Sequence, residues 1–226
     1  MKHVVTVKRR ALAASEACAD VLRRRFDDAG TLVTNLISSP GSGKTTLLEA
    51  TARHMKERHT LAVIEGDVAT ERDADRLRAL GVPAHQILTG GACHLDARQV
   101  EGALEEAGLL PVDILFIENV GNLICPTTYD LGEDFKVAVL SVTEGDDKPF
   151  KYPAIFARAE VTVVSKIDLL PHLPFDVEAV DEQLRSLNPT GTILRTSATT
   201  GEGIDAWCEL LARRLSDKRD SSNRDS

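Results

Sequence analysis

The segment SSPGSGKTT, which begins at Ser38, has the residue types and spacing of a phosphate-binding loop. Its glycines, Gly41 and Gly43, allow backbone N–H groups to close around phosphate oxygens. Lys44 is placed to contact the β- and γ-phosphates, and the Thr45 hydroxyl is placed to bind magnesium. Ser38 stands where this motif usually has its first glycine. The nucleotide-binding residues predicted here are Gly41, Ser42, Gly43, Lys44, Thr45 and Thr46.

Two later segments have the residue types of a guanine-binding site. In SKID, Asp168 can accept hydrogen bonds from the N1–H and amino groups of guanine, which adenine does not present in that arrangement, and Lys166 would lie along the base. Ser165 replaces the asparagine that is usual in this motif. In SAT, Ser197 and the backbone N–H of Ala198 are placed for a second contact with the base. The two segments together favour GTP over ATP.

Two carboxylates end apolar segments, Asp67 in IEGD and Glu118 in ILFIEN. Carboxylates at the carboxyl edge of a parallel sheet lie beside its phosphate loop, where magnesium needs oxygen ligands, so Thr45, Asp67 and Glu118 are the predicted magnesium ligands. An alternative role for Asp67 is the N-cap of the next helix. Gly121 in ENVG resembles a switch glycine that contacts the γ-phosphate. The predicted catalytic residues are Lys44, Thr45, Asp67 and Glu118.

Cys93, His94 and Cys125 form a third group with metal-binding chemistry. Two thiolates and an imidazole are a soft ligand set suited to zinc or nickel. Three ligands from one chain need a solvent molecule or a symmetric dimer to complete the site. Spacing alone leaves open the alternative that the thiols are ordinary buried residues. A catalytic Cys–His pair is less favoured, because adjacent residues rarely face each other productively.

These residues need a sheet whose strands end at one edge. Apolar segments alternate with amphipathic ones, which indicates an α/β fold with a mainly parallel sheet and helices on both faces, the P-loop NTPase architecture. Strands are predicted over residues 32–37, 61–66, 113–119, 136–142, 161–166 and 192–197, and helices over 44–57, 71–80, 97–107, 176–187 and 203–215.

Three regions are expected along the chain. Residues 1–29 are predicted to form a helical extension packed on the main domain, with a helix over 10–29 that ends at Gly30. Residues 30–215 are predicted to be a P-loop GTPase domain. Hydrophobicity falls afterwards, so residues 216–226 are predicted to be a disordered tail.

Composition narrows the class of protein. The chain has 226 residues and a net charge of -8, which disfavours nucleic-acid and anionic-membrane partners. It has no apolar run of membrane-spanning length and no signal-peptide pattern, so we expect a cytoplasmic protein. Its four cysteines show no regular spacing, which argues against a disulfide framework.

Four segments resemble one known family: VTNLISSPGSGKTTLLEAT, IEGDVATERDADRLRALGVPAHQILTGGACHLDA, ILFIENVGNLICPTTYDLGEDFKVAVLSVTEGDDKPFKYP and VVSKIDLL. Over residues 30–215 the chain resembles the HypB family of hydrogenase maturation GTPases, of the SIMIBI class. The resemblance implies a homodimer that hydrolyses GTP with magnesium and helps insert nickel into the large subunit of nickel–iron hydrogenase. It implies that Cys93, His94 and Cys125 bind nickel or zinc near the dimer interface, and that a small HypA-like nickel chaperone and the hydrogenase large subunit are partners.

Other functions remain as alternatives. One is a P-loop kinase for a small molecule, with structural cysteines; another is a urease-type nickel GTPase such as UreG, which places a proline between its cysteine and histidine. A storage or scaffold protein with a vestigial nucleotide site is a third. The chain shows no water-orienting glutamine or arginine finger, so we expect slow turnover, on the order of 10⁻² s⁻¹ or below. Lys148 and Lys151 either reach a nucleotide across a dimer interface or form a solvated charge cluster.

Overall fold

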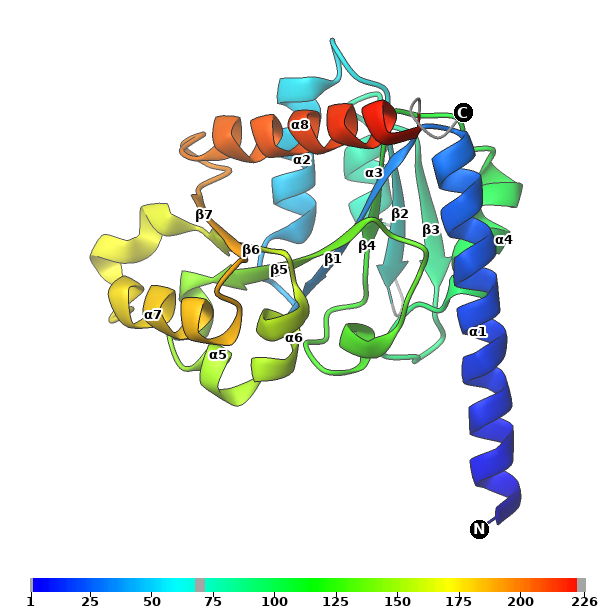
Figure 1. Ribbon diagram of the computed structural model, residues 1–226. Helices are drawn as coiled ribbons and strands as arrows, with labels where there is room; N and C mark the ends of the chain where they lie inside the picture. The colour runs from blue at the N-terminus through cyan, green and yellow to red at the C-terminus, as the bar shows by residue number, and fades with distance from the viewer. Residues whose placement is uncertain (1, 68–71, 223–226) are drawn as a thin grey trace.

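The computed structural model describes residues 2–67 and 72–222, with side chains from residue 13 onward, and a seven-stranded sheet lies at its centre (Figure 1). The strand order is β3-β2-β4-β1-β5-β6-β7, and all neighbouring strands are parallel. This confirms the predicted α/β architecture. The strands are β1 (Leu32–Ser38), β2 (Leu61–Asp67), β3 (Ala84–Leu88), β4 (Ile114–Glu118), β5 (Phe135–Ser141), β6 (Val161–Ser165) and β7 (Thr192–Thr196).

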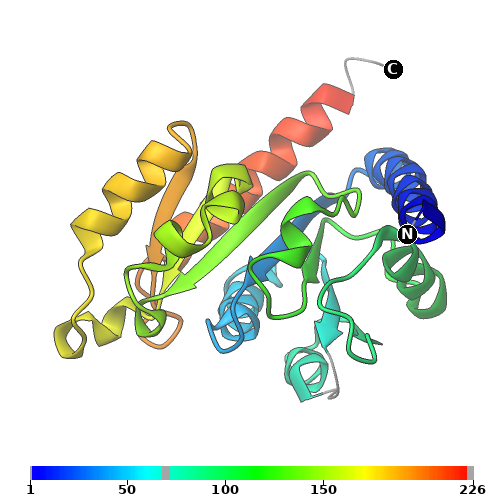
Figure 2. The same ribbon diagram turned by 90° about the horizontal axis from the view of Figure 1, so that it is seen from below.

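Alternate side chains of the strands build separate cores on the two faces of the sheet. Leu32 and Leu36 of β1 pack with α2, α3 and α8 on one face, whereas Val33 and Ile37 point to the other face. There, α1 and α4 lie side by side at one end of the sheet and α7 lies at the other end (Figure 2). The α-helices are α1 (Lys2–Asp28), α2 (Lys44–Met55), α3 (Arg72–Arg78), α4 (Ala97–Ala107), α5 (Lys148–Lys151), α6 (Pro153–Arg158), α7 (Val177–Leu187) and α8 (Ile204–Ser222).

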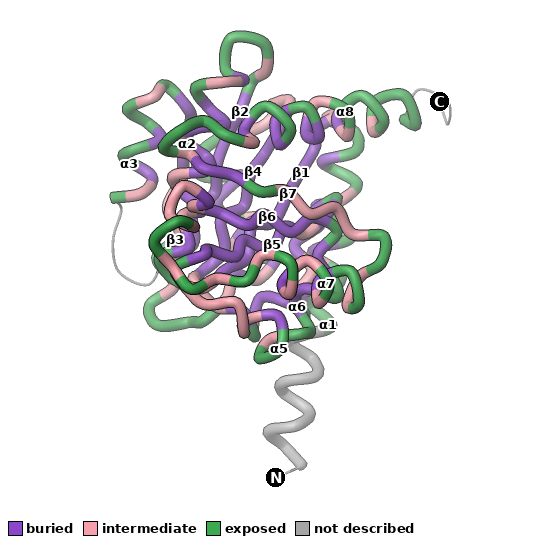
Figure 3. Tube along the Cα trace, turned by 90° about the vertical axis from the view of Figure 1, so that its left-hand side faces the viewer, coloured by how far each residue is buried: buried purple, intermediate pink, exposed green. Residues whose placement is uncertain are grey.

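Strand β1 lies in the middle of the sheet, paired with β4 on one side and β5 on the other. Strands β2, β3 and β4 lie on one side of β1, and strands β5, β6 and β7 lie on the other side. Doubly wound sheets bind ligands in the crevice at the carboxyl ends of the strands where the strand order reverses in this way. All seven residues of β1 are buried, and Figure 3 shows exposed residues concentrated in the connecting loops and on the outer helices. The loop after β1 is the predicted phosphate loop.

Strand β3 and helices α5 and α6 are absent from the sequence-based prediction, and helices α1 and α8 are longer than predicted. Strand β3 is not predicted, because it lies at the edge of the sheet and its middle residues, His85 and Gln86, are polar and only partly buried. Helix α1 begins at Lys2, eight residues before the predicted start at residue 10, and its buried face carries Ala19, Leu22 and Phe26. The predicted helix over 71–80 is α3, and residue 71 lies outside the described residues.

The predicted disordered tail is wrong over residues 216–222, where α8 continues to Ser222. Basic side chains fix this part of the helix to the body of the protein. The Lys218 ammonium lies 2.8 Å from a carboxylate oxygen of Asp27 and 2.7 Å from one of Asp134. The Arg219 guanidinium lies 2.5 Å from a carboxylate oxygen of Asp113. Residues 223–226 lie outside the described residues.

Within the described residues, no helix has the length and apolar character needed to cross a membrane.

Candidate functional site

The phosphate loop is closed by hydrogen bonds centred on Ser38. The Ser38 hydroxyl accepts a hydrogen bond from Lys44 Nζ at 3.0 Å and another from the Ser42 hydroxyl at 2.5 Å. Gly41 and Gly43 have φ angles of 75° and 95°, in the left-handed region that favours glycine. The serine at the usual glycine position thus holds the lysine side chain within the loop.

The predicted catalytic residues converge beside this loop. Glu118 Oε1, at the end of β4, accepts a hydrogen bond from Thr45 Oγ1 at 3.0 Å and lies 3.7 Å from Lys44 Nζ. On the neighbouring strand β2, Glu65 pairs with Glu118, and Asp67 is two residues further along. Side chains two residues apart in a strand project from the same face, so Asp67 lies on the face that carries Glu118. Helix α3 is described from Arg72 onward, and the N-cap alternative for Asp67 falls on residues 68–71, which lie outside the described residues.

Sequence analysis did not single out Glu65, which is the close neighbour of Glu118. Burial, and then the charge and hydrogen bonding of Glu118, raise the pKa of Glu65 to about 10, so this carboxyl keeps its proton at neutral pH. Within the described part of the chain, Glu65 Oε1 and Glu118 Oε2 are buried oxygens without a hydrogen-bond partner. The signal in the sequence is the Glu65-x-Asp67 spacing, which places both carboxyl groups on one face.

A cleft of about 490 Å³ opens over the phosphate loop and these carboxyl groups. Arg76 and Asp73 of α3 also line it and were not predicted. The Arg76 guanidinium is held at 2.9 Å by Glu49 and at 3.0 Å by Asp73, which links α2 to α3. The predicted residues that line the cleft are Gly41, Gly43, Lys44, Thr45, Thr46, Asp67, Glu118, Gly121 and Lys166.

The segment after β6 is attached to the phosphate loop by two side chains. Lys166 adopts a φ of 60° and its Nζ donates a hydrogen bond to the Gly41 carbonyl at 2.6 Å. The Ser165 hydroxyl donates to the Ser42 carbonyl at 2.7 Å. Serine at the position where asparagine is usual therefore still reaches the phosphate loop.

The two predicted base-binding segments meet after β6 and β7. Asp168 Oδ1 accepts a hydrogen bond from the Ser197 hydroxyl at 2.6 Å, and the Ser197 oxygen accepts one from the Thr200 backbone N–H at 3.1 Å. Ala198, which follows Ser197, packs partly buried against the core. These bonds fix the orientation of the Asp168 carboxylate.

The predicted metal ligands also come together. The ligand atoms of Cys93, His94 and Cys125 all lie within 4.8 Å of one another, and Cys93 Sγ is 3.6 Å from His94 Nδ1. Cys93 and His94 belong to the loop between β3 and α4, whereas Cys125 begins the short 3₁₀ helix η1 (Cys125–Thr128). All four cysteines of the chain are free thiols. The clustering disfavours the alternative in which Cys93 and Cys125 are unrelated structural thiols.

Local interactions favour the neutral forms of Cys93 and His94 in the metal-free protein. A hydrogen bond with Cys125, and to a smaller extent burial, raise the pKa of the Cys93 thiol. Burial lowers the pKa of His94, although the negative charge of Asp96 opposes this. A neutral imidazole is ready to bind a metal ion, whereas the thiols must lose protons when they bind one.

The segment between Glu118 and Cys125 contacts both sites. A Cβ atom on Gly121 would come within 2.9 Å of Pro40 Cγ, so this glycine packs directly on the phosphate loop. Asn119 is buried, and its Oδ1 accepts a hydrogen bond from the backbone N–H of Leu95, the residue after His94, at 3.1 Å. One short segment thus joins the phosphate loop to both parts of the thiol–imidazole cluster.

Lys148 and Lys151 bond to partners close to them in sequence. Lys148 Nζ lies 3.7 Å from Glu144 and 5.4 Å from the centre of the Tyr152 ring, and Lys151 pairs with Asp147. Neither lysine is among the described residues that line the cleft. Within one chain, this arrangement is a charged cluster on the surface.

Comparison with known proteins identifies one matching family and several similar proteins. The nucleotide-binding domain family CobW/HypB/UreG matches residues 32–195. The hydrogenase maturation factor HypB of Escherichia coli K12 is 51% identical over 213 residues, covering 93% of this chain and 72% of that protein. The hydrogenase/urease maturation factor HypB of Helicobacter pylori is 40% identical over 226 residues, covering 98% of this chain and 93% of that protein. The crystal structure of H. pylori HypB in complex with nickel matches with a TM-score of 0.85 and 42% identity, covering 92% of this chain and 97% of that chain.

Proposed function

The chain belongs to the HypB family of hydrogenase maturation factors, and we propose that it is a GTP-hydrolysing metallochaperone of nickel–iron hydrogenase maturation. In this proposal Cys93, His94 and Cys125 bind nickel or zinc, and the GTP state controls the release of the metal. The observation that carries the proposal is the convergence of these three ligand atoms within 4.8 Å of one another. A relative with 42% identity has been crystallised with nickel, which supports nickel as the cargo.

Guanine specificity rests on Asp168. An ionised carboxylate can accept hydrogen bonds from both N1–H and the amino group of guanine, whereas adenine offers no such pair of donors. The Ser197 hydroxyl bond at 2.6 Å holds this carboxylate in place. Lys166 is fixed against the phosphate loop and would lie along the base.

Magnesium is the cofactor that the phosphate loop requires, and Thr45, Asp67 and Glu118 would hold it. The donor set fits, because Glu118 Oε2 is a buried carboxylate oxygen that lacks a hydrogen-bond partner among the described residues. When bound, magnesium would supply positive charge opposite the phosphate oxygens. Glu118 Oε1 already accepts the Thr45 hydroxyl bond, which places this hydroxyl oxygen beside a carboxylate.

Hydrolysis would depend on positioning and charge stabilisation by the phosphate loop. Lys44 is buried and aligned by Ser38, so its ammonium group would face the β- and γ-phosphates without rearrangement. Arg76 lines the cleft, but Glu49 and Asp73 already bind its guanidinium group. A paired arginine is poorly available to the transition state, which supports turnover on the order of 10⁻² s⁻¹ or below.

Coupling would run through the segment that carries Gly121. This glycine packs on Pro40 of the phosphate loop, and Cys125 lies four residues further along. A γ-phosphate that binds the Gly121 N–H would fix the start of this segment, and hydrolysis would release it. Because Asn119 also binds the loop that carries His94, both halves of the metal site would respond.

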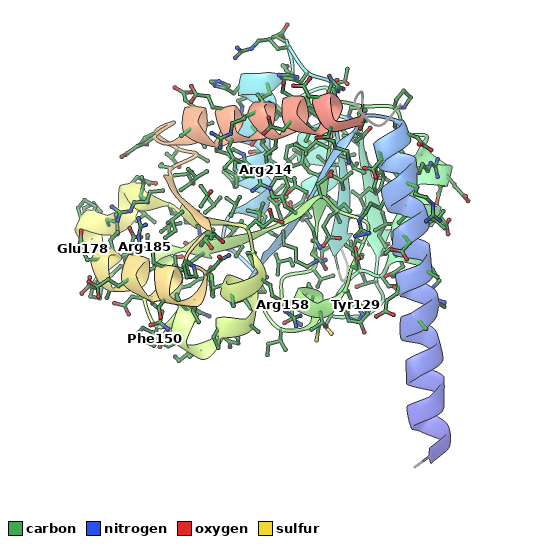
Figure 4. The ribbon with its side chains drawn as sticks, viewed as in Figure 1. Tyr129, Phe150, Arg158, Glu178, Arg185 and Arg214 are labelled. Carbon is green, nitrogen blue, oxygen red and sulfur yellow. The ribbon has the colours of Figure 1, made fainter. Side chains whose placement is uncertain are left out.

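A homodimer would complete the metal site, since one chain supplies three ligands. Ile124 is 65% exposed beside Cys125, and Phe150 of α5 is 61% exposed (Figure 4). We propose a small HypA-like nickel chaperone and the hydrogenase large subunit as further partners, and a cytoplasmic location. The relative named as a hydrogenase/urease factor makes urease a second candidate recipient of the metal.

Nickel binding by single-cysteine variants tests the proposal. Cys93→Ala and Cys125→Ala should each weaken nickel binding at least tenfold, measured by competition with a chromophoric chelator. Cys208→Ala is the matched control, because Cys208 is a buried free thiol of α8 outside this cluster and should leave nickel affinity unchanged. Equal nickel affinity in all four proteins would contradict the proposed metal site.

Protection against heat unfolding tests the nucleotide class. GTP with magnesium should raise the melting temperature, and ATP at the same concentration should not, because only a ligand bound by the folded protein stabilises it. Protection by ATP alone would favour the alternative of a small-molecule kinase.

A further inference from the structure

We propose that Tyr129 is a positioning residue of the thiol–imidazole site: its ring fixes the plane of the His94 imidazole so that Nδ1 faces the thiols. Helix α1 holds Tyr129 in place through Arg23. This inference rests on the proposed metal site and adds to it a residue and an element outside the ligand set. Figure 4 shows Tyr129 between Arg158 and α1.

The rings of His94 and Tyr129 are stacked, with their centres 3.8 Å apart and their planes at 27°. In this orientation His94 Nδ1 lies 3.6 Å from Cys93 Sγ. An imidazole on a loop can otherwise turn about two side-chain bonds, and most of those orientations point its nitrogens away from the thiols. Stacking restricts the ring to the plane in which it can bind the shared metal.

Tyr129 follows directly after η1, the helix that Cys125 begins. Its backbone N–H donates to the Pro126 carbonyl at 3.3 Å, and its carbonyl accepts a hydrogen bond from Lys136 Nζ at 3.0 Å. The same short segment therefore carries one ligand, Cys125, and the ring that orients another. A shift of this segment moves both together.

Helix α1 fixes the segment on its other side. Arg23 Nη2 donates to both carboxylate oxygens of Asp130, the residue after Tyr129, at 2.8 Å each. Gly132 has a φ of 81°, and a Cβ atom there would lie 2.9 Å from the Ala19 carbonyl oxygen of α1. The loop after Tyr129 is thus packed directly on the helix backbone.

The loop that carries Cys93 and His94 is attached to the same helix. The backbone N–H of Ala97, three residues after His94, donates to the Ser15 hydroxyl at 3.4 Å. Cys18 Sγ donates to Glu101 of α4 at 3.4 Å. Helix α1 therefore contacts both segments of the metal site. Arg23 binds the segment that carries Cys125 and Tyr129, and Ser15 binds the segment that carries Cys93 and His94, so the helix sets the distance between the two segments.

Residues that orient metal ligands without binding the metal typically change affinity about 10- to 100-fold when they are mutated. We therefore expect Tyr129→Leu, which keeps an apolar side chain but removes the flat ring, to weaken nickel binding about tenfold. Tyr129→Phe should restore near wild-type affinity, because the stacked ring is retained. Equal nickel affinity of Tyr129→Leu and wild type would overturn the proposal.

A readout without metal separates positioning from a general loss of stability. The ring current of Tyr129 should shift the His94 ring-proton resonances upfield in the metal-free wild type and in Tyr129→Phe. These resonances should return toward ordinary positions in Tyr129→Leu while the spectrum of the rest of the protein stays dispersed. Unchanged His94 resonances in Tyr129→Leu would contradict stacking in solution.

The role of α1 is tested independently of the tyrosine. Arg23→Ala should weaken nickel binding and reduce the upfield shift of His94, whereas Arg24→Ala should do neither, because Arg24 is exposed on the same helix. If Arg23→Ala and Arg24→Ala have the same nickel affinity and the same His94 resonances, the proposed role of α1 is wrong. Failure of the wild-type protein to bind nickel through Cys93 would instead refute the metal site itself, so the two failures are distinguishable.

Discussion

Gly121 lies so close to Pro40 that a Cβ atom at Gly121 would come within 2.9 Å of Pro40 Cγ and 3.0 Å of its backbone nitrogen. The Gly121→Ala methyl group therefore cannot fit unless the phosphate loop and the segment toward Cys125 move apart. We expect this variant to bind a non-hydrolysable GTP analogue at least tenfold more weakly, measured by isothermal titration calorimetry. Gly102→Ala is the control, because the added methyl group meets no atom within 4 Å. An equal loss of affinity for the GTP analogue in Gly121→Ala and Gly102→Ala would refute the steric argument.

Glu65 gives the nucleotide-free protein a defined pH dependence. Its pKa is raised from 4.5 to about 10 by burial and by Glu118, so the folded state holds a proton that the unfolded state releases above pH 4.5. The stability from this group is complete below that value and is lost as the pH rises toward 10. We expect the free energy of unfolding of the wild type to fall more steeply between about pH 6 and pH 9 than that of Glu65→Gln, in urea titrations.

The exposed residue Glu57 supplies the control for this experiment. Glu57→Gln should follow the wild-type pH dependence, because its carboxylate stays in water in both states. Parallel curves for wild type and Glu65→Gln would show that Glu65 is ionised in the folded protein at neutral pH.

We propose that Asp168 sets the preference among purine nucleotides. Asp168→Asn replaces an acceptor oxygen with an amino group, which would face the N1–H and amino donors of guanine. We expect GTP affinity to fall about 100-fold, since two hydrogen bonds to a charged group are lost. Xanthosine triphosphate, which carries an oxygen in place of the guanine amino group, should gain affinity. Fluorescence competition with both nucleotides measures the change, and an unaltered preference for GTP would contradict this assignment.

The four thiols should differ in reactivity toward an alkylating reagent. Burial, with smaller effects of Glu101, raises the pKa of Cys18 to about 11, and burial raises that of Cys208 to about 12, so both are almost fully protonated at about pH 8. Cys93 is exposed and Cys125 is half-buried, so we expect both to react first. Nickel should protect Cys93 and Cys125, and mass spectrometry of peptides checks this order. Rapid modification of Cys208 would contradict its burial.

Local sequence patterns are sufficient to predict the central part of the structure. Six apolar segments and the glycine, lysine and threonine pattern of the phosphate loop each depend on neighbours in sequence, and the structure places them as expected. The alternation between the two faces also places Asp67 and Glu118 beside the loop. Strand β3 is missed because an edge strand with His85 and Gln86 lacks an apolar pattern.

Features that depend on contacts distant in sequence are not predictable in this way. The last turns of α8 are polar, and it is Asp27, Asp113 and Asp134 elsewhere in the chain that hold them. The stacking of Tyr129 on His94 joins residues from two loops that no local pattern relates. Glu65 differs from these, because its spacing from Asp67 was visible in the sequence.

The central claim is that the nucleotide state controls the metal site, and nickel affinity with GDP and with a non-hydrolysable GTP analogue tests it most directly. We expect the two affinities of the wild-type protein to differ at least tenfold, which corresponds to about 1.4 kcal/mol of coupling. The difference should be absent in Cys93→Ala. Equal nickel affinities in the two nucleotide states would contradict the account and leave the thiol–imidazole cluster as a metal site that does not respond to GTP.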